Sequence, residues 1–227
     1  MSSRLTQYLS VSSSWSDSLR SSYIWMFFGL AISGVASWLV VSNSSLSNAI
    51  LTNGVFVILL VVELVLVFIL SGRIFKMSYS SALVAYVAYA ALNGVTLSAV
   101  LVDANDTSLA TAFAVTALLF AAMAAYGSLT KNDLSSAGSF LFMGLLGLVL
   151  ASVVNIVLQN DVFSYILSYI TVAVFIGLTA YDAQKLKQLA AIENSPNVGL
   201  YGALTLYLDF INIFLSLFNI FGSRRRN

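Results

Sequence analysis

The sequence predicts an all-α integral membrane protein with seven transmembrane helices. Hydrophobic residues make up 59% of the 227 residues and charged residues only 8%, whereas a soluble domain carries about 25% charged residues. The apolar residues lie in long uninterrupted runs, and a helix of about 20 apolar residues crosses the hydrocarbon core of a bilayer. A transmembrane β-barrel would show short alternating strands instead, so helices are the expected spanning elements.

Seven segments have the length and apolar character of a membrane span. They contain only two of the charged residues, Glu63 and Asp209, and the one proline of the chain, Pro196, lies outside them. The segments are 23–41, 51–71, 80–101, 110–129, 138–158, 162–181 and 200–221. We therefore predict a flexible Ser-rich tail over residues 1–22, a seven-helix membrane domain over 23–222 and a basic tail over 223–227.

The residue types that are missing exclude several kinds of chemistry. The chain has no Cys and no His, which excludes disulfides, thiolate or imidazole metal sites and catalysis by Ser-His-Asp or Cys-His groups. Proton chemistry must therefore use Asp, Glu, Lys or Tyr. With a net charge of +1, nucleic acid is not an expected partner. We expect no resident cofactor and no enzymatic activity.

The basic residues predict the orientation through the positive-inside rule. With a cytoplasmic N-terminus, the inner segments hold Arg4, Arg20, Arg73, Lys76, Lys131, Lys185 and Lys187. The outer loops lack Lys and Arg and carry Asp103, Asp106 and Asp161. Seven crossings place the basic tail 224–226 outside, which opposes the rule, and a last segment that re-enters and returns is the alternative. We expect a full crossing and a periplasmic C-terminus.

Small residues are dense in several of the predicted helices. They let helix backbones approach closely in a membrane, so we expect them at helix contacts. The clearest groups are Ala121, Ala122, Ala124 and Ala125 with Gly127, and Gly144 with Gly147.

Asp209 is the strongest candidate for a functional residue. It lies near the middle of the last apolar segment, where an ionised Asp costs about 2.5–3.5 kcal/mol on insertion scales. The polar positions of this segment follow helical spacing and therefore share one face: Gly202, Thr205, Asp209, Asn212, Ser216 and Asn219. A structural hydrogen-bonding stripe is one interpretation and a functional path through the bundle is the other, which we favour.

Asp182 is the second candidate. If the sixth helix continues to about residue 192, Asp182 and Asp209 lie at a similar depth of about 14 Å on adjacent antiparallel helices. Two carboxyl groups that meet in a low dielectric do not both ionise, so the pair would share a proton. Such a pair can sense pH without His, and its oxygens can bind a hard cation such as Ca²⁺. An interfacial charge beside two lysines is the alternative role of Asp182.

Glu63 and Arg73 lie on the second predicted helix, at its middle and its inner end. Glu63 is within the membrane, and we expect it to bond to Asn93 or Thr96 of the third helix, where Tyr86, Tyr89, Asn93 and Thr96 form a polar stripe. Arg73 is either a counter-ion of the carboxylate pair or an ordinary flanking charge.

Four runs of the sequence carry a resemblance to a known family. They are YGALTLYLDFINIFL from 201, GLTAYDAQKLK at 177–187, ALNGVTLS at 91–98 and YGSLTKNDL at 126–134. These runs resemble the transmembrane Bax inhibitor motif family, most closely its bacterial inner-membrane branch. The resemblance covers the chain from about residue 22 to the end.

The resemblance implies seven helices with the last one central, an inner-membrane location and a pH-sensitive calcium leak. The two aspartates of the family would match Asp182 and Asp209, its latch arginine Arg73 and its second-helix glutamate Glu63. A protonated or Arg-latched pair would hold the path closed. Glu63, Asn93, Thr205 and Asn212 would line or support the path, with Ca²⁺, protons and the bilayer as partners.

Two other functions fit the same sequence. One is an interaction protein that modulates a stress response or a partner such as a membrane-bound ATP-dependent protease, with structural carboxylates. The other is an intramembrane aspartyl protease, because Tyr181 precedes Asp182. The Gly-x-Gly-Asp motif of those proteases is absent, since Asp209 follows Leu206, Tyr207 and Leu208, and Pro196 is followed by Asn197 rather than Ala-Leu.

Overall fold

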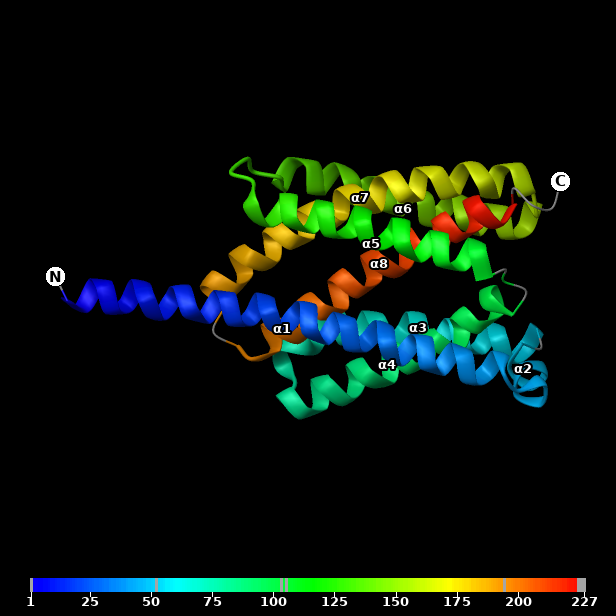
Figure 1. Cartoon of the computed structure of the whole chain (residues 1–227), viewed down its shortest axis with the longest axis horizontal. Helices are drawn as coiled ribbons and strands as arrows, with labels where there is room; N and C mark the ends of the chain where they lie inside the picture. The colour runs from blue at the N-terminus through cyan, green and yellow to red at the C-terminus, as the bar shows by residue number, and fades with distance from the viewer. Residues whose placement is uncertain (1, 52, 103, 105, 194, 224–227) are drawn as a thin grey trace. The chain divides into compact units, whose positions relative to one another are not determined.

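A computed structural model describes residues 2–51, 53–102, 104, 106–193 and 195–223, with the side chains of 2–16, 53 and 223 excepted. All its regular elements are helices (Figure 1). They are α1 (Ser2–Val41), α2 (Ser44–Ile50), α3 (Asn53–Arg73), the 3₁₀ helix η1 (Ile74–Lys76), α4 (Tyr79–Leu101), α5 (Asp106–Leu129), α6 (Ser135–Leu158), α7 (Asp161–Ile192) and α8 (Asn197–Ser223). Asp103 and the tail residues 224–226 lie outside the described residues.

Among the described residues, seven helices are long and apolar enough to cross a membrane, so the predicted all-α membrane fold is confirmed. The spans are Asp17–Val41, Gly54–Lys76, Tyr79–Leu101, Asp106–Leu129, Ser135–Leu158, Asp161–Ile192 and Asn197–Gly222. In the most apolar stretch of the last span 61% of the residues are buried, compared with 6% in the corresponding stretches of α3 and α6. This burial agrees with the expected interior position of the last helix.

Two helices are longer than the apolar runs within them. α1 begins at Ser2, so the Ser-rich segment has helical backbone, and its flexibility stays a prediction. α7 has 32 residues and continues past the predicted end at 181 to Ile192. Residues 178–192 contain neither Gly nor Pro, and Pro196 lies four residues beyond the end of the helix.

The chain divides into two compact units. Unit 1 contains residues 1–103 and 189–207, and unit 2 contains residues 104–188 and 208–227. The first half of α8 therefore belongs to unit 1 and the second half to unit 2.

In unit 1, α4 lies against both α1 and α3 (Figure 1). A Cβ at Gly94 would lie 2.4 Å from the carbonyl oxygen of Ser33, so the backbones of α1 and α4 are in contact there. The start of α8 is anchored by Asn197, whose amide donates hydrogen bonds to the carbonyl oxygens of Ile74 (2.6 Å) and Met77 (2.8 Å).

In unit 2, the second half of α8 packs on α5. Phe113 and Phe120 of α5 both place their rings edge-on to Phe210 of α8. The small residues of α5 and α6 are only partly used as expected. Ala124 and Gly127 are buried, but Ala121, Ala122 and Ala125 are exposed, and a Cβ at Gly147 would meet nothing within 4 Å. The prediction was wrong there because composition alone does not say which face of a helix meets a neighbour.

Candidate functional site

The carboxyl group of Asp209 is buried in the middle of the last span. Asp209 is only 3% exposed, and its Oδ2 atom has no hydrogen-bond partner. A buried polar atom without a partner is unfavourable and rare in native proteins. Its place in the middle of an apolar span makes Asp209 the first candidate for a functional residue.

Asp182 of α7 lies close enough to Asp209 for the two carboxyl groups to interact electrostatically. Both residues belong to unit 2. The hydroxyl of Thr179, one turn before Asp182, lies near the Asp209 side chain and donates a hydrogen bond to the Phe175 carbonyl at 2.7 Å. The predicted condition for this pairing, continuation of the sixth spanning helix to about residue 192, is met because α7 ends at Ile192.

Lys185 is the charged neighbour of the pair within unit 2. It lies one turn beyond Asp182 on α7 and interacts with that carboxylate electrostatically. Its ammonium group also lies 5.7 Å from the centre of the Tyr181 ring, within cation–π range. Thr179 and Lys185 were not among the predicted site residues, although both stand three residues from Asp182, the spacing of side chains on one helical face.

Glycines let α7 approach its neighbours at the aspartate. A Cβ at Gly127 of α5 would lie 2.0 Å from the carbonyl oxygen of Ala180, and one at Gly138 of α6 would lie 2.3 Å from the ring of Tyr181. Real Cβ atoms do not approach so closely. These two glycines therefore allow α5 and α6 to pack closely against the turn of α7 that ends at Asp182.

The loop between α5 and α6 is hydrogen-bonded to α7 just beyond Asp182. The Gln184 side chain accepts a hydrogen bond from the Leu134 N–H (2.9 Å) and donates one to the Asn132 carbonyl (2.8 Å). Within this loop, hydrogen bonds from the side chain and backbone of Ser135 hold the pKa of the exposed Asp133 carboxyl below its ordinary value. Gln184 ties α7 to the loop two residues beyond Asp182.

Glu63 lies in unit 1 and is fully engaged in hydrogen bonds. Asn93 Nδ2 donates to Glu63 Oε1, and Thr96 Oγ1 donates to Glu63 Oε2 at 2.7 Å. Both partners belong to α4 and were the ones expected from the sequence, so this prediction is confirmed.

The network around Glu63 extends to residues that sequence reasoning missed. Tyr207 of α8 donates to Asn93 Oδ1 at 2.6 Å, and the Tyr207 and Ser33 hydroxyls are 2.7 Å apart. Ser33 Oγ also donates to the Ala90 carbonyl of α4 at 2.7 Å. A tyrosine among Leu residues gives no polar periodicity, so no signal in the sequence pointed to it.

The other predicted site residues are placed as follows. Arg73 is exposed at the end of α3 and belongs to unit 1, whereas both aspartates belong to unit 2, so the latch stays a prediction. Thr205 donates to the Tyr201 carbonyl and Asn212 to the Leu208 carbonyl, both within α8. Their predicted role in lining a path therefore also stays a prediction.

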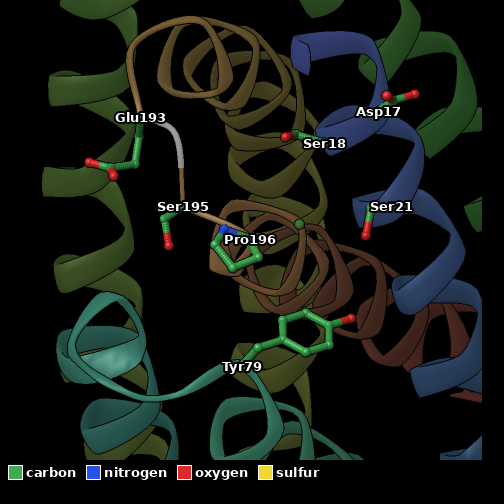
Figure 2. Close-up of a pocket in the computed structure, with 8 residues that line it drawn as sticks. Asp17, Ser18, Ser21, Tyr79, Glu193, Ser195 and Pro196 are labelled. Carbon is green, nitrogen blue, oxygen red and sulfur yellow. The ribbon is translucent and has the colours of Figure 1, made fainter. Parts of the chain in front are cut away.

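A crevice of about 430 Å³ in unit 1 also contains two carboxylates (Figure 2). It is lined by Asp17, Ser18, Ser21, Tyr79, Glu193, Ser195, Pro196 and Gly199. Figure 2 shows that Glu193 lies across the crevice from Asp17 and points away from it. The carboxylates do not converge, so this crevice is not a candidate cation site.

The acidic residues of the described part of the chain form no larger cluster than a pair. Among the described residues, no three Asp or Glu side chains lie close enough together to hold an ion. Ca²⁺ takes six to eight oxygen ligands in its stable sites, and the aspartate pair supplies two side chains.

The fold of the described residues defines an all-α membrane protein of seven candidate spans, with buried Asp209 in the last span and Asp182 in the span before it. The family model described as "Inhibitor of apoptosis-promoting Bax1" matches residues 16–226. The chain therefore belongs to the Bax inhibitor-like family, as the resemblance indicated.

Relatives from distant bacteria cover most of this chain. It is 43% identical over 210 residues to the inner membrane protein YbhL of Escherichia coli, across 89% of this chain and 90% of YbhL. It is 41% identical over 206 residues to an uncharacterized protein of Deinococcus radiodurans, across 89% and 88% of the two chains. An uncharacterized membrane protein of Streptococcus pyogenes is 42% identical over 166 residues, across 71% and 72%.

Proposed function

We propose that this protein is a pH-sensitive calcium leak channel, or a proton-coupled calcium transporter, whose gate is the Asp182–Asp209 pair. The observation that carries the proposal is the buried Asp209 carboxyl, which has an unpartnered oxygen and interacts electrostatically with Asp182. Ionisable residues inside a membrane span are costly and usually serve ion or proton transport.

The proposed gate uses the sharing of a proton between two neighbouring carboxyl groups. Two carboxylates in a low dielectric repel each other, so one proton is retained between them at moderate pH. Loss of that proton leaves two charges that repel each other and attract a divalent cation. The path is thus closed while the pair is protonated and opens as the pH rises.

Positive charge beside the pair tunes this response. Lys185 interacts with Asp182 within unit 2, and we propose that it favours the ionised form of the pair. Arg73 remains the proposed latch from the family resemblance. Glu63 holds α3 against α4 through Asn93 and Thr96 and is assigned a supporting role.

We propose a location in the bacterial inner membrane with the N-terminus in the cytoplasm. YbhL is named an inner membrane protein, and the basic residues of the loops favour this orientation. Seven full crossings then place the C-terminal end of α8 on the periplasmic side.

Calcium uptake into dye-loaded proteoliposomes tests the function directly. The wild type should show flux above empty liposomes, and the flux should fall when the pH is stepped from 8 to 6. D182N and D209N should lose this pH dependence while remaining folded. Absence of wild-type flux at every pH, with folded protein, would contradict the proposal and favour an interaction protein with structural carboxylates.

A further inference from the structure

A polar groove lies in unit 2 between α6, α7 and α8. Its volume is about 360 Å³, which is room for on the order of ten water molecules at about 30 Å³ each. Eight of its eleven lining residues end in a hydroxyl or an amide, and none is charged. Representative members are Ser152 and Asn155 of α6, Ser164 and Ser168 of α7, and Asn212 and Ser216 of α8.

The groove lies at the end of unit 2 that carries the loop between α6 and α7. Its lining starts at Ser164, three residues after the start of α7, and continues to Thr171, ten residues after it. Asn212 lies eleven residues before the end of α8. At 1.5 Å per residue the groove extends about 15 Å into the span, which is about half of the hydrocarbon core.

Polar side chains that line a groove at this depth need hydrogen-bonding molecules inside the groove. The donors of several lining residues are engaged within the protein. Asn219 Nδ2 donates to Ser168 Oγ at 2.8 Å, and Ser168 Oγ donates to the Ser164 carbonyl at 3.0 Å. Thr171 and Asn212 donate to carbonyl oxygens of their own helices. Lipid tails offer no hydrogen bonds to the remaining oxygens, and hydroxyls or amides exposed to hydrocarbon are unfavourable. A groove that is large enough for water and lined by oxygen atoms is therefore filled with water rather than lipid.

The polar lining points along both helices toward the aspartate pair. On α8, Asn212, Ser216 and Asn219 lie within about 80° of Asp209 around the helix axis, at 100° per residue. On α7, Ser164, Ser168 and Thr171 lie on the face that continues to Thr179 and Asp182. Between them on that face stands Phe175, which is buried. An apolar ring at a constriction is a known kind of hydrophobic gate.

We propose that the groove is a water-filled half-path that opens on the outer side and carries hydrated cations to within one helical turn of Asp209, where Phe175 closes it. The cation part of this inference rests on the proposed function, but the hydration does not. Neutral oxygens suit such a path because they replace hydrating water without holding an ion tightly.

The natural absence of Cys makes the test a labelling experiment without background. Single variants S152C and S216C are exposed to a charged, membrane-impermeant thiol reagent in intact cells and in inverted vesicles. L150C is the control for a position that faces lipid, because Leu150 is 69% exposed and does not line the groove. T179C is the control beyond Phe175, since Thr179 is fully buried.

S152C and S216C should react from the outer side at least about tenfold faster than L150C, because only a hydrated thiol ionises and meets the reagent. T179C should stay unlabelled, and F175A/T179C should react. Modified S216C should show reduced calcium flux in liposomes. Rates at S152C and S216C no higher than at L150C, or labelling only from the inner side, would overturn the half-path. Because labelling needs no calcium, that outcome is distinct from a failure of the proposed function.

Discussion

The protein has span carboxylates in two settings, Glu63 in unit 1 and the Asp182–Asp209 pair in unit 2, that differ in how completely they are bonded. In unit 1, Glu63 accepts hydrogen bonds from Asn93 and Thr96 on its two oxygens, and the network continues through Tyr207 to Ser33. In unit 2, Asp209 has an oxygen without a partner and a second carboxylate beside it. The first arrangement holds one structure through its hydrogen bonds, whereas we propose that the second changes when a proton or ion arrives.

One residue of the Glu63 network and one residue of the aspartate pair lie close together on α8. Tyr207 and Asp209 are two residues apart, so their side chains leave the helix about 200° apart. Tyr207 bonds to α4 and α1 within unit 1, and Asp209 meets α7 within unit 2. Substitutions at each place should therefore have different consequences for stability and for transport.

The largest expected effect concerns the packing that holds Asp182 in place. G127A adds a Cβ that would collide with the backbone of Ala180, and overpacking of this kind costs about 3 kcal/mol or more when backbone must move. G147A is the matched control, because its Cβ would meet nothing within 4 Å. Thermal unfolding in detergent should show a strongly lowered Tm for G127A and little change for G147A. Equal Tm values would mean that α5 and α7 are not in close contact.

The next effect concerns the bonded carboxylate. N93L removes the donor to Glu63 Oε1 and the acceptor of the Tyr207 hydroxyl, and the loss of these two hydrogen bonds should cost about 2 kcal/mol. N212A is the control, because its amide bonds only to the Leu208 carbonyl within its own helix. We expect denaturant unfolding to give a clear loss for N93L and a loss below about 0.5 kcal/mol for N212A. A stable N93L would show that the network is dispensable.

A smaller effect concerns the free energy of unfolding, which we expect to change in different directions when Glu63 and Asp209 are neutralised. E63Q turns one of the two accepting oxygens of Glu63 into a donor, so the hydrogen bonds from Asn93 and Thr96 cannot both be kept as they are, and it should cost about 1 kcal/mol. D209N removes charge from a group whose oxygen lacks a partner, so it should be neutral or stabilising by up to about 1 kcal/mol. Unfolding of both variants at pH 8 gives the comparison. Destabilisation of D209N by as much as E63Q would mean that the pair contributes to stability.

The smallest effect is a shift of the pH response of transport. K185Q removes the positive charge beside Asp182, so the pair should take up its proton at higher pH. The midpoint of the flux response should then rise by less than about one pH unit. K187Q is the control, because Lys187 bonds to the Ser128 carbonyl at 2.8 Å. An unchanged midpoint in K185Q would leave Arg73 as the basic residue to examine.

The sequence predicted the spans and the ionisable residues well because both follow from the cost of polarity in a bilayer. Apolar runs located the seven helices, and Glu63 and its partners on α4 followed from polar spacing. The end of α7 could not be predicted from the sequence, because Lys185 and Lys187 are typical of the residues that flank the end of a membrane span. Gln184 and Tyr207 were missed because their hydrogen bonds depend on tertiary contacts. The groove was missed because a Ser or Thr in a helix can bond to its own backbone.

The most direct test of the account compares the two carboxylates in one assay. Calcium flux into proteoliposomes would be measured at pH 8 and pH 6 for the wild type, D209N and E63Q, each checked for folding. The account predicts that D209N loses the difference between the two pH values, while E63Q keeps it despite its lower stability. Loss of the difference in E63Q with its retention in D209N would contradict the assignment of the gate to the pair formed by Asp182 and Asp209.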